Sequence, residues 1–216
     1  MQKSVEAEKI LRESNTIISG DHFVYISGHH GDGWVNKDAI LPDTRKISRL
    51  AFLMAESLKD LKIDIVCGPA VGGLVISQWV AYHLDLPSVF AEHQDNRGAD
   101  TKEMRPPFQL KRGFDKIVRG KNVLIVDDIV NTGLSIRETA DAVRKCAGQV
   151  IAASAYCTRG NVDAAGMEVP RFIYLVQIDI PSWTAEECTL CKTGVPVNTD
   201  FAHGREFVES SVAVNE

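Results

Sequence analysis

The 216-residue sequence has no apolar run close to the ~20 residues that a membrane-spanning helix requires. It also lacks an excess of basic residues, because its formal net charge is −5. A general nucleic-acid-binding protein needs a basic face to displace counterions from phosphates. These absences argue against a membrane protein and against a nucleic-acid-binding protein, so any recognition of phosphate must be local.

The sequence has few cysteines, and their number, five, is odd. The chain is long enough to fold without disulfides. Reduced thiols are the better interpretation. The first residues, MQKSVEAEKILRES, lack the apolar core and small-residue cleavage site of a secretory signal. We therefore expect a cytoplasmic location. The composition, 44% hydrophobic and 25% charged, is that of an ordinary globular protein.

The length fits one α/β domain, since single cores commonly reach this size. Short apolar runs alternate with helical patterns, which predicts a mainly parallel five-stranded sheet with helices on both faces. The predicted strands span residues 63–67, 88–91, 123–126, 150–156 and 172–178, and the predicted helices span 4–13, 45–61, 73–84 and 134–146. Within a single domain 1–216, we expect an N-terminal hood at about 1–43, a core at about 44–180 and a C-terminal tail at about 181–216.

A long polar segment follows the second predicted strand, from about residue 91 to residue 121, with Pro106 and Pro107 in its middle. A connection of this length in a compact domain is usually either a functional lid or disordered. We interpret it as a mobile lid, because ligands of such sheets bind beyond the carboxyl ends of the strands.

The strongest signal is VLIVDDIVNTGLS at residues 123–135, a buried strand with two acids and a Thr-Gly turn that opens a helix. Free backbone N–H groups and the dipole at a helix start attract phosphate, and Gly133 permits close approach of the backbone. Asp127 and Asp128, at the expected strand end, are placed to accept hydrogen bonds from a vicinal diol. The motif predicts a site for a ribose 5-phosphate. The alternative, that the acids only end a strand and cap a helix, leaves adjacent like charges uncompensated.

A second Gly-rich turn, CGPAVGGL at residues 67–74, also lies between a predicted strand and a helix. The pair Gly72-Gly73 would let backbone amides face a second anionic group, such as a diphosphate. Taken alone, such glycines serve equally well for tight packing of a helix on a strand.

Together these segments resemble the type I phosphoribosyltransferases: VLIVDDIVNTGLS resembles their phosphoribosyl-diphosphate signature, and GPAVGG resembles their diphosphate loop. The orotate phosphoribosyltransferases are similar in two further segments. Their hood resembles HFVYISGHHGDGWVNKDAI, and their lid resembles VFAEHQDNRGADTKEMRPPFQLKRGF. The resemblance covers about residues 20–160.

The resemblance implies transfer of the 5-phosphoribosyl group from phosphoribosyl diphosphate to orotate, which gives orotidine 5′-phosphate and diphosphate in pyrimidine biosynthesis. It implies Mg²⁺ carried by the substrate, with no protein ligand assigned, and a homodimer in which each lid reaches the partner's site. The residues implied in phosphoribosyl diphosphate binding are Ala70, Val71, Gly72, Gly73, Asp127, Asp128, Ile129, Val130, Asn131, Thr132, Gly133, Leu134 and Ser135. Those implied in catalysis are Asp127, Asp128, Lys111, Arg112, Lys102 and Arg105, and those implied in base binding are Thr132, Arg159, Trp34 and Val35.

Two alternatives remain open. His93 stands directly after the Phe-Ala-Glu element, where many relatives have arginine, which points to a phosphoribosyltransferase for another nucleobase. A non-catalytic sensor of phosphoribosyl diphosphate is a different class of protein, and the acidic charge and lack of a separate basic domain weigh against it.

The tail carries one C-x-x-C pair, Cys188 and Cys191, with His203 downstream. Such a pair could ligate zinc, but a structural tetrahedral site needs four ligands and the sequence has only this pair. The alternative is a helix end and turn packed on the sheet.

Overall fold

The computed structural model describes residues 4–93 and 106–213, with side chains described as far as residue 209. The chain divides into two compact units. Unit 1 comprises Met1–Ile10 and Leu41–Ile178, and unit 2 comprises Leu11–Ile40 and Asp179–Glu216. The organisation as a single domain stays a prediction. Two predicted lid residues, Lys102 and Arg105, lie outside the described residues.

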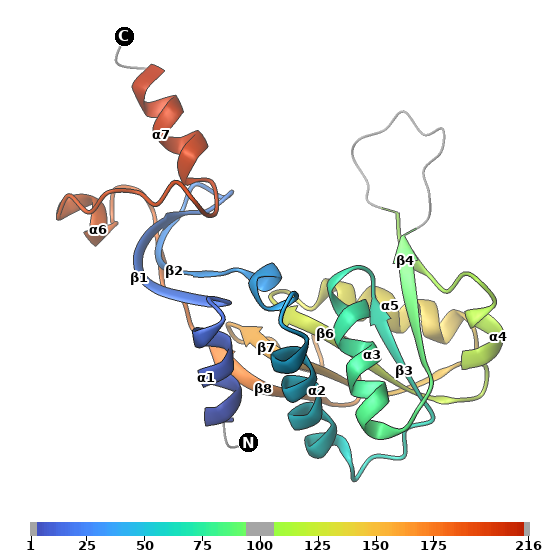
Figure 1. Ribbon diagram of the computed structural model, residues 1–216. Helices are drawn as coiled ribbons and strands as arrows, with labels where there is room; N and C mark the ends of the chain where they lie inside the picture. The colour runs from blue at the N-terminus through green and yellow to red at the C-terminus, as the bar shows by residue number, and fades with distance from the viewer. Residues whose placement is uncertain (1–3, 94–105, 214–216) are drawn as a thin grey trace. The chain divides into compact units, whose positions relative to one another are not determined.

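Unit 1 is built on a six-stranded sheet in the order β5-β4-β3-β6-β7-β8 (Figure 1). Its strands are β3 (Ile65–Pro69), β4 (Ser88–His93), β5 (Phe108–Gln109), β6 (Asn122–Val130), β7 (Gln149–Arg159) and β8 (Phe172–Ile178). All neighbouring pairs are parallel except β4 and β5, which are antiparallel. The parallel strands leave their carboxyl ends at one edge of the sheet, where ligands bind in open α/β folds.

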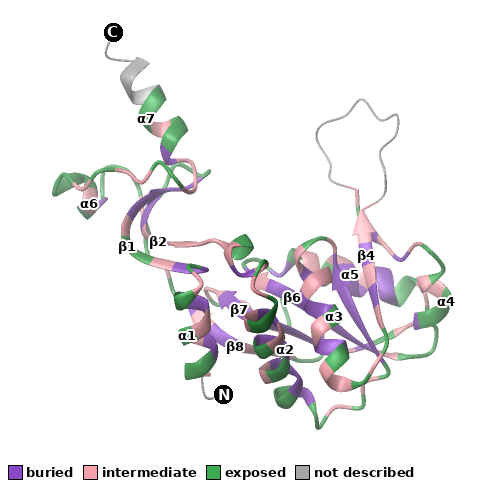
Figure 2. Ribbon diagram, viewed as in Figure 1, coloured by how far each residue is buried: buried purple, intermediate pink, exposed green. Residues whose placement is uncertain are grey.

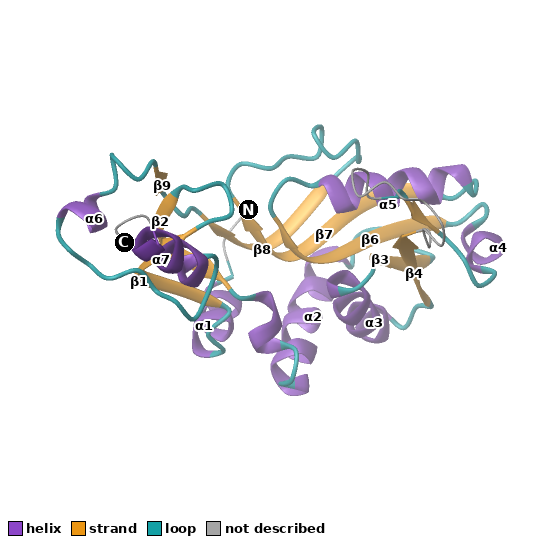
Figure 3. Ribbon diagram, turned by 90° about the horizontal axis from the view of Figure 1, so that it is seen from above, coloured by secondary structure: helices purple, strands orange, loops and turns teal. Residues whose placement is uncertain are grey.

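Helices cover both faces of this sheet. α2 (Thr44–Leu58) and α3 (Gly72–Leu84) lie on one face, and α5 (Leu134–Lys145) lies on the other (Figure 3). Because both faces are covered, the central strands are buried: all five residues of β3 are buried, as is most of β6 (Figure 2). In α5 the buried residues Ile136, Ala140 and Val143 recur at helical spacing, which gives the helix one apolar face for the sheet.

The five predicted strands are confirmed, with ends shifted by a few residues, and so are the four predicted helices, the first of them as α1 (Val5–Glu13). The predicted end of α2 at residue 61 is wrong, because the helix ends at Leu58. β5 and the short helix α4 (Phe114–Val118) are not predicted by the sequence pattern. Elements of so few residues are too short to show a hydrophobic period.

One predicted boundary at the site is also wrong. Asp127 and Asp128 do not follow the end of their strand but lie within β6, which continues to Val130. The strand continues because Val130 is paired with Thr158 of β7, past the two acids. Backbone pairing therefore holds both carboxylates in a fixed strand geometry.

Unit 2 contains a three-stranded antiparallel sheet in the order β1-β2-β9. Its elements are β1 (Ile17–Val24), β2 (His30–Val35), the 3-10 helix η1 (Lys37–Ile40), β9 (Ser182–Trp183), α6 (Thr189–Lys192) and α7 (Gly204–Ala213). Trp34 stacks on Phe23 and Tyr25, with 6.4 and 6.2 Å between ring centroids. Across the described parts of both units, no helix is long and apolar enough to cross a membrane.

Candidate active site

Three neighbouring strands of unit 1 bring the two Gly-rich motifs to one edge of the sheet. β3 pairs with β6, with Cys67 opposite Ile125, and β6 pairs with β7, with Val130 opposite Thr158. The turn after β3 leads into α3, and the turn after β6 leads into α5. The two motifs, which lie far apart in the sequence, therefore form one site.

The acids Asp127 and Asp128 are almost fully buried, with 7% and 5% of their surface exposed. The Asp128 N–H donates to Asp127 Oδ1 at 2.9 Å, and the Ile129 N–H donates to Asp128 Oδ1 at 2.6 Å. Asp128 Oδ2 is buried and accepts no hydrogen bond from the described residues. A buried acceptor without a donor is costly, so this oxygen is suited to accept a hydrogen bond from a ligand hydroxyl.

The glycines of the other motif lie against these carboxylates. A Cβ atom at position 72 would lie 2.1 Å from Asp128 Oδ2, and one at position 73 would lie 2.9 Å from Asp127 Oδ1. A Cβ at position 73 would also lie 2.5 Å from Pro69 Cδ, so Gly73 serves close packing as well. Gly72 is required by the acid beside it, because any side chain at this position would displace the Asp128 carboxylate.

Both helices at this edge begin without a side-chain hydrogen bond from the N-cap residue. α3 begins at Gly72 after Val71, which is joined to Ala70 by a cis peptide bond. α5 begins at Leu134 after Gly133, whose φ of +77° lies in the left-handed region. The first N–H groups of a helix and its dipole attract anions. The two helix starts thus offer two positions for anionic groups beside the carboxylates.

The turn from β6 to α5 is anchored from inside the unit. A Cβ at Gly133 would lie 2.3 Å from Met167 Cγ, so only glycine fits above this methionine. Asn131 and Thr132 are exposed, and Thr132 Oγ1 accepts the Leu134 N–H at 3.4 Å. The turn therefore keeps a fixed backbone while its polar side chains remain accessible.

β7 places Arg159 at the same edge of the sheet. The preceding residue, Thr158, pairs with Val130, and its hydroxyl donates to the Val130 carbonyl at 3.3 Å.

Burial, and then the charge of Asp128, raise the pKa of the neighbouring Cys157 to about 12. This thiol therefore stays neutral near pH 7 and is not a nucleophile.

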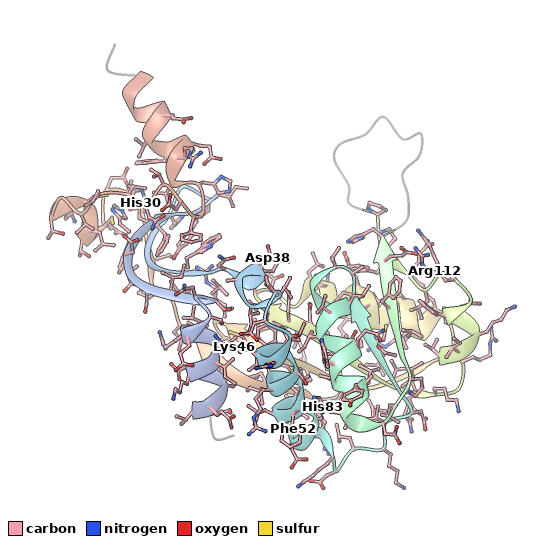
Figure 4. All side chains as sticks on the ribbon, in the orientation of Figure 1. His30, Asp38, Lys46, Phe52, His83 and Arg112 are labelled. Atoms are coloured by element: carbon pink, nitrogen blue, oxygen red, sulfur yellow. The ribbon has the colours of Figure 1, made fainter. Side chains whose placement is uncertain are left out.

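The predicted lid cations Lys111 and Arg112 lie beside β4 (Figure 4 labels Arg112). Lys111 Nζ donates to the His93 carbonyl at 3.0 Å, and the Arg112 guanidinium donates to both Glu92 carboxylate oxygens at 3.2 Å. Both cations are therefore engaged by β4 rather than by the carboxylates of β6. Glu92, which binds Arg112, is not among the predicted site residues. The sequence indicates it only weakly, as an acid at the end of a predicted strand and before a segment that contains arginines.

His93, the residue that suggested another nucleobase, packs against its neighbours in this structure. Its ring stacks on Phe108 of β5 with 3.9 Å between centroids, and its Nδ1 is hydrogen-bonded to the Pro106 carbonyl. These contacts join β4 to β5 at the base of the predicted lid. The ring of His93 therefore packs between its neighbours, while its buried Nε2 has no hydrogen-bond partner among the described residues.

Trp34 and Val35, which are predicted to bind the base, lie in β2 of unit 2. Trp34 is partly buried there and stacks on Phe23 and Tyr25. The part of both residues in base binding stays a prediction.

Comparison with known proteins identifies the family. Residues 37–183 match the family model of the phosphoribosyl transferase domain. An orotate phosphoribosyltransferase of Caldanaerobacter subterraneus is 34% identical over 89% of this chain and 96% of its own length, and one of Sphingopyxis alaskensis is 36% identical over 82% and 85%. The crystal structure of orotate phosphoribosyltransferase from Aeropyrum pernix has the same fold, with a TM-score of 0.62 and 23% identity over 86% of this chain and 97% of that one. The chain therefore belongs to the phosphoribosyltransferase family, among the orotate phosphoribosyltransferases.

Proposed function

We propose that the protein transfers the 5-phosphoribosyl group from phosphoribosyl diphosphate to orotate and releases diphosphate, as an enzyme of pyrimidine biosynthesis. The observation that carries the proposal is the buried pair Asp127-Asp128 at the edge where two helices begin. Asp128 Oδ2 accepts no hydrogen bond from the described residues and lies against Gly72. Phosphoribosyl diphosphate carries a ribose diol, a 5-phosphate and a diphosphate. A site that binds it therefore needs acceptors for the two hydroxyls and positions for two anionic groups. The names of the relatives add orotate as the acceptor.

Each part of the site takes one part of the substrate. The carboxylates of Asp127 and Asp128 accept hydrogen bonds from the two ribose hydroxyls. The turn from Ile129 to Ser135 holds the 5-phosphate at the start of α5, and Ala70 to Gly73 hold the diphosphate at the start of α3. Held in this way, the anomeric carbon is fixed between a leaving diphosphate and an incoming ring nitrogen.

The reaction breaks the bond between the anomeric carbon and the diphosphate, and positive charge develops on the ribose. The carboxyl groups of Asp127 and Asp128 stabilise this charge because their oxygens lie close to the ring. Oxygen donors suit Mg²⁺, and the carboxylates with the unpartnered Asp128 Oδ2 are compatible with a magnesium ion held by the substrate's own oxygens. When bound, Mg²⁺ neutralises the negative charge that grows on the departing diphosphate.

The lid supplies further positive charge to the diphosphate. Lys111 and Arg112 are the first candidates, and Lys102 and Arg105 are the second. For Arg112 this role requires release of Glu92, to which it is bound at 3.2 Å. Lid closure would also exclude water, which otherwise hydrolyses the activated ribose.

The base is held by Arg159, with Thr132, Trp34 and Val35 as further contacts. A guanidinium matches the planar carboxylate of orotate. We expect Arg159→Ala to raise the KM for orotate by about 10- to 100-fold, the loss of one charged hydrogen-bonded pair, without changing the Kd of phosphoribosyl diphosphate. Steady-state kinetics and calorimetry measure the two constants. Arg171→Ala, at the amino end of β8, is the control, and equal weakening of both substrates would contradict the assignment.

The test of the proposed function is the loss of orotate absorbance in the presence of Mg²⁺ and phosphoribosyl diphosphate, against a panel of purine and pyrimidine bases. Turnover of orotate alone supports the proposal. Turnover of another base supports the alternative raised by His93, and binding of phosphoribosyl diphosphate without release of diphosphate supports a sensor.

We further propose a cytoplasmic homodimer in which the lid of one subunit reaches the site of the other. The activity per chain should then fall when the protein is diluted below the concentration at which the dimer dissociates. A monomer that keeps full activity at high dilution would contradict this arrangement.

A further inference from the structure

Four side chains of unit 2 that take no part in the proposed reaction converge on one point. They are His22 of β1, His30 of β2, Cys188 just before α6 and Cys191 within α6. Their ligand atoms all lie within 4.8 Å of one another, and all but Cys191 are buried. His203, the histidine downstream of the C-x-x-C pair, is not among them, and its Nδ1 lies 3.9 Å from Glu206 Oε2.

Three nitrogen–sulfur distances within this Cys2His2 cluster are close to those between the ligands of a single tetrahedral ion. With Zn–S near 2.3 Å and Zn–N near 2.05 Å, a tetrahedron separates nitrogen from sulfur by about 3.6 Å and nitrogen from nitrogen by about 3.4 Å. His22 Nε2 lies 3.6 Å from Cys188 Sγ and 3.7 Å from Cys191 Sγ, and His30 Nδ1 lies 3.3 Å from Cys191 Sγ. The two ring nitrogens are 2.8 Å apart, so they need to open by about 0.6 Å to admit the ion.

His22 has the outer contact that is typical of a metal ligand, whereas His30 Nε2 is buried without a hydrogen-bond partner among the described residues. His22 Nδ1 lies 2.8 Å from the Val195 carbonyl, which can only accept, so this nitrogen carries the proton. Nε2, the other nitrogen of this ring, lies in the cluster. A hydrogen bond from the second ring nitrogen to a backbone carbonyl is the usual outer contact of a metal-ligating histidine. Cys188 Sγ accepts the Cys191 N–H at 3.5 Å, so the backbone of the C-x-x-C pair itself contacts this sulfur.

We propose that His22, His30, Cys188 and Cys191 bind one Zn²⁺ ion in a structural site. Two thiolates and two imidazoles are a ligand set that zinc prefers, and four protein ligands leave no open position for substrate. A [2Fe–2S] centre with the same residue types divides the cysteines and histidines between two irons. Here each sulfur lies within 3.7 Å of a ring nitrogen, which fits one shared ion.

The site joins segments from opposite ends of the sequence. Cys188 and His22 are 166 positions apart, and the ion would fasten the tail before and within α6 to the hairpin of β1 and β2 (Figure 4 labels His30). The described part of unit 2 has a three-stranded sheet whose third strand has two residues, and few of its apolar side chains are buried. Small units with little core are commonly stabilised by a metal, and binding free energy then becomes folding free energy. This role does not depend on the proposed phosphoribosyl transfer.

The first test is the metal content of the full chain, purified without chelator and measured by plasma mass spectrometry. We expect about one zinc ion per chain, as a closed four-ligand site predicts. Replacement by Co²⁺ should give the intense visible bands of a tetrahedral cobalt–thiolate centre. Cys191→Ser, the variant at the exposed ligand, should lower the zinc content at least tenfold. Cys146→Ser and His203→Gln, a cysteine and a histidine outside the cluster, should keep the metal.

The wild-type measurement needs no substituted chain, so the proposal can fail even if the variants do not fold. It is overturned if the wild-type protein is isolated without zinc and takes up neither Zn²⁺ nor Co²⁺. A disulfide between Cys188 and Cys191 in protein purified under reducing conditions also overturns it, as does equal metal loss in the control variants. One iron ion in place of zinc would overturn the choice of metal.

Discussion

Asp128→Asn is expected to lower kcat/KM for phosphoribosyl transfer by at least about 100-fold and to leave the free energy of unfolding unchanged or higher. The proposed role of Asp128 is to accept a ribose hydroxyl and to stabilise positive charge on the ring. A hydrogen bond to a charged group contributes about 1.5–3 kcal/mol, and 1.36 kcal/mol corresponds to tenfold in rate. The lost charge in the transition state adds to this effect.

Stability should respond in the opposite direction because the ligand-free site is electrostatically unfavourable. Asp127 and Asp128 are adjacent, almost fully buried carboxylates, and Asp128 Oδ2 has no hydrogen-bond donor among the described residues. Asparagine keeps an oxygen for the Ile129 N–H, which donates to Asp128 Oδ1 at 2.6 Å, and removes one of two repelling charges. Residues that bind a ligand often lower the stability of the ligand-free protein.

The two expectations are checked together by steady-state kinetics and chemical denaturation. Asp141→Asn is the matched control, since Asp141 lies on α5 with its side chain 49% exposed and pairs with Arg144 at 3.1 Å. It should change neither quantity appreciably. A loss of activity that tracks a loss of stability in Asp128→Asn would show a structural role for the acid and would contradict its place in the site.

Much of the architecture of unit 1 could be predicted from the sequence because buried parallel strands read as continuous apolar runs. The run from Val123 to Val126 and the glycines at 72 and 73 also place their turns at the carboxyl ends of strands, where ligands bind. The order of the strands could not be predicted, since periodicity carries no information on pairing. Nor could the close approach of Gly72 to Asp128, which depends on β3 and β6 being neighbours in the sheet.

Features that depend on long-range contacts were beyond the sequence pattern. The C-x-x-C pair suggested a metal, but His22 and His30 lie in a different part of the chain and only folding of unit 2 brings them to Cys188 and Cys191. Similarly, His93 suggested a change of substrate, and its contact with Phe108 across β4 and β5 is visible only in the fold. In both cases the residue type was visible and its partner was not.

Gly72→Ala is expected to weaken phosphoribosyl diphosphate binding and lower kcat/KM by at least about 100-fold, although it adds a single methyl group. The new Cβ would lie 2.1 Å from Asp128 Oδ2, so the carboxylate must move away from the position in which it accepts the ribose hydroxyl. A displacement of this size is enough to cost about two orders of magnitude in rate when the group positions the substrate. Gly166→Ala, whose Cβ would lie 3.3 Å from Asp163 Oδ1, is the mild control.

A double-substitution cycle separates this mechanism from a general distortion of the turn. Asp128→Ala removes the atom that the new methyl group would meet, so Gly72→Ala should have little further effect in that background. The coupling between the two substitutions should then be large, as expected for residues in direct contact. Calorimetric titration with phosphoribosyl diphosphate and steady-state kinetics are measured for the wild type, the two single variants and the double variant. Strictly additive effects would mean that Gly72 acts through the backbone of α3 alone, and the contact between the two motifs would then have no part in binding the ribose.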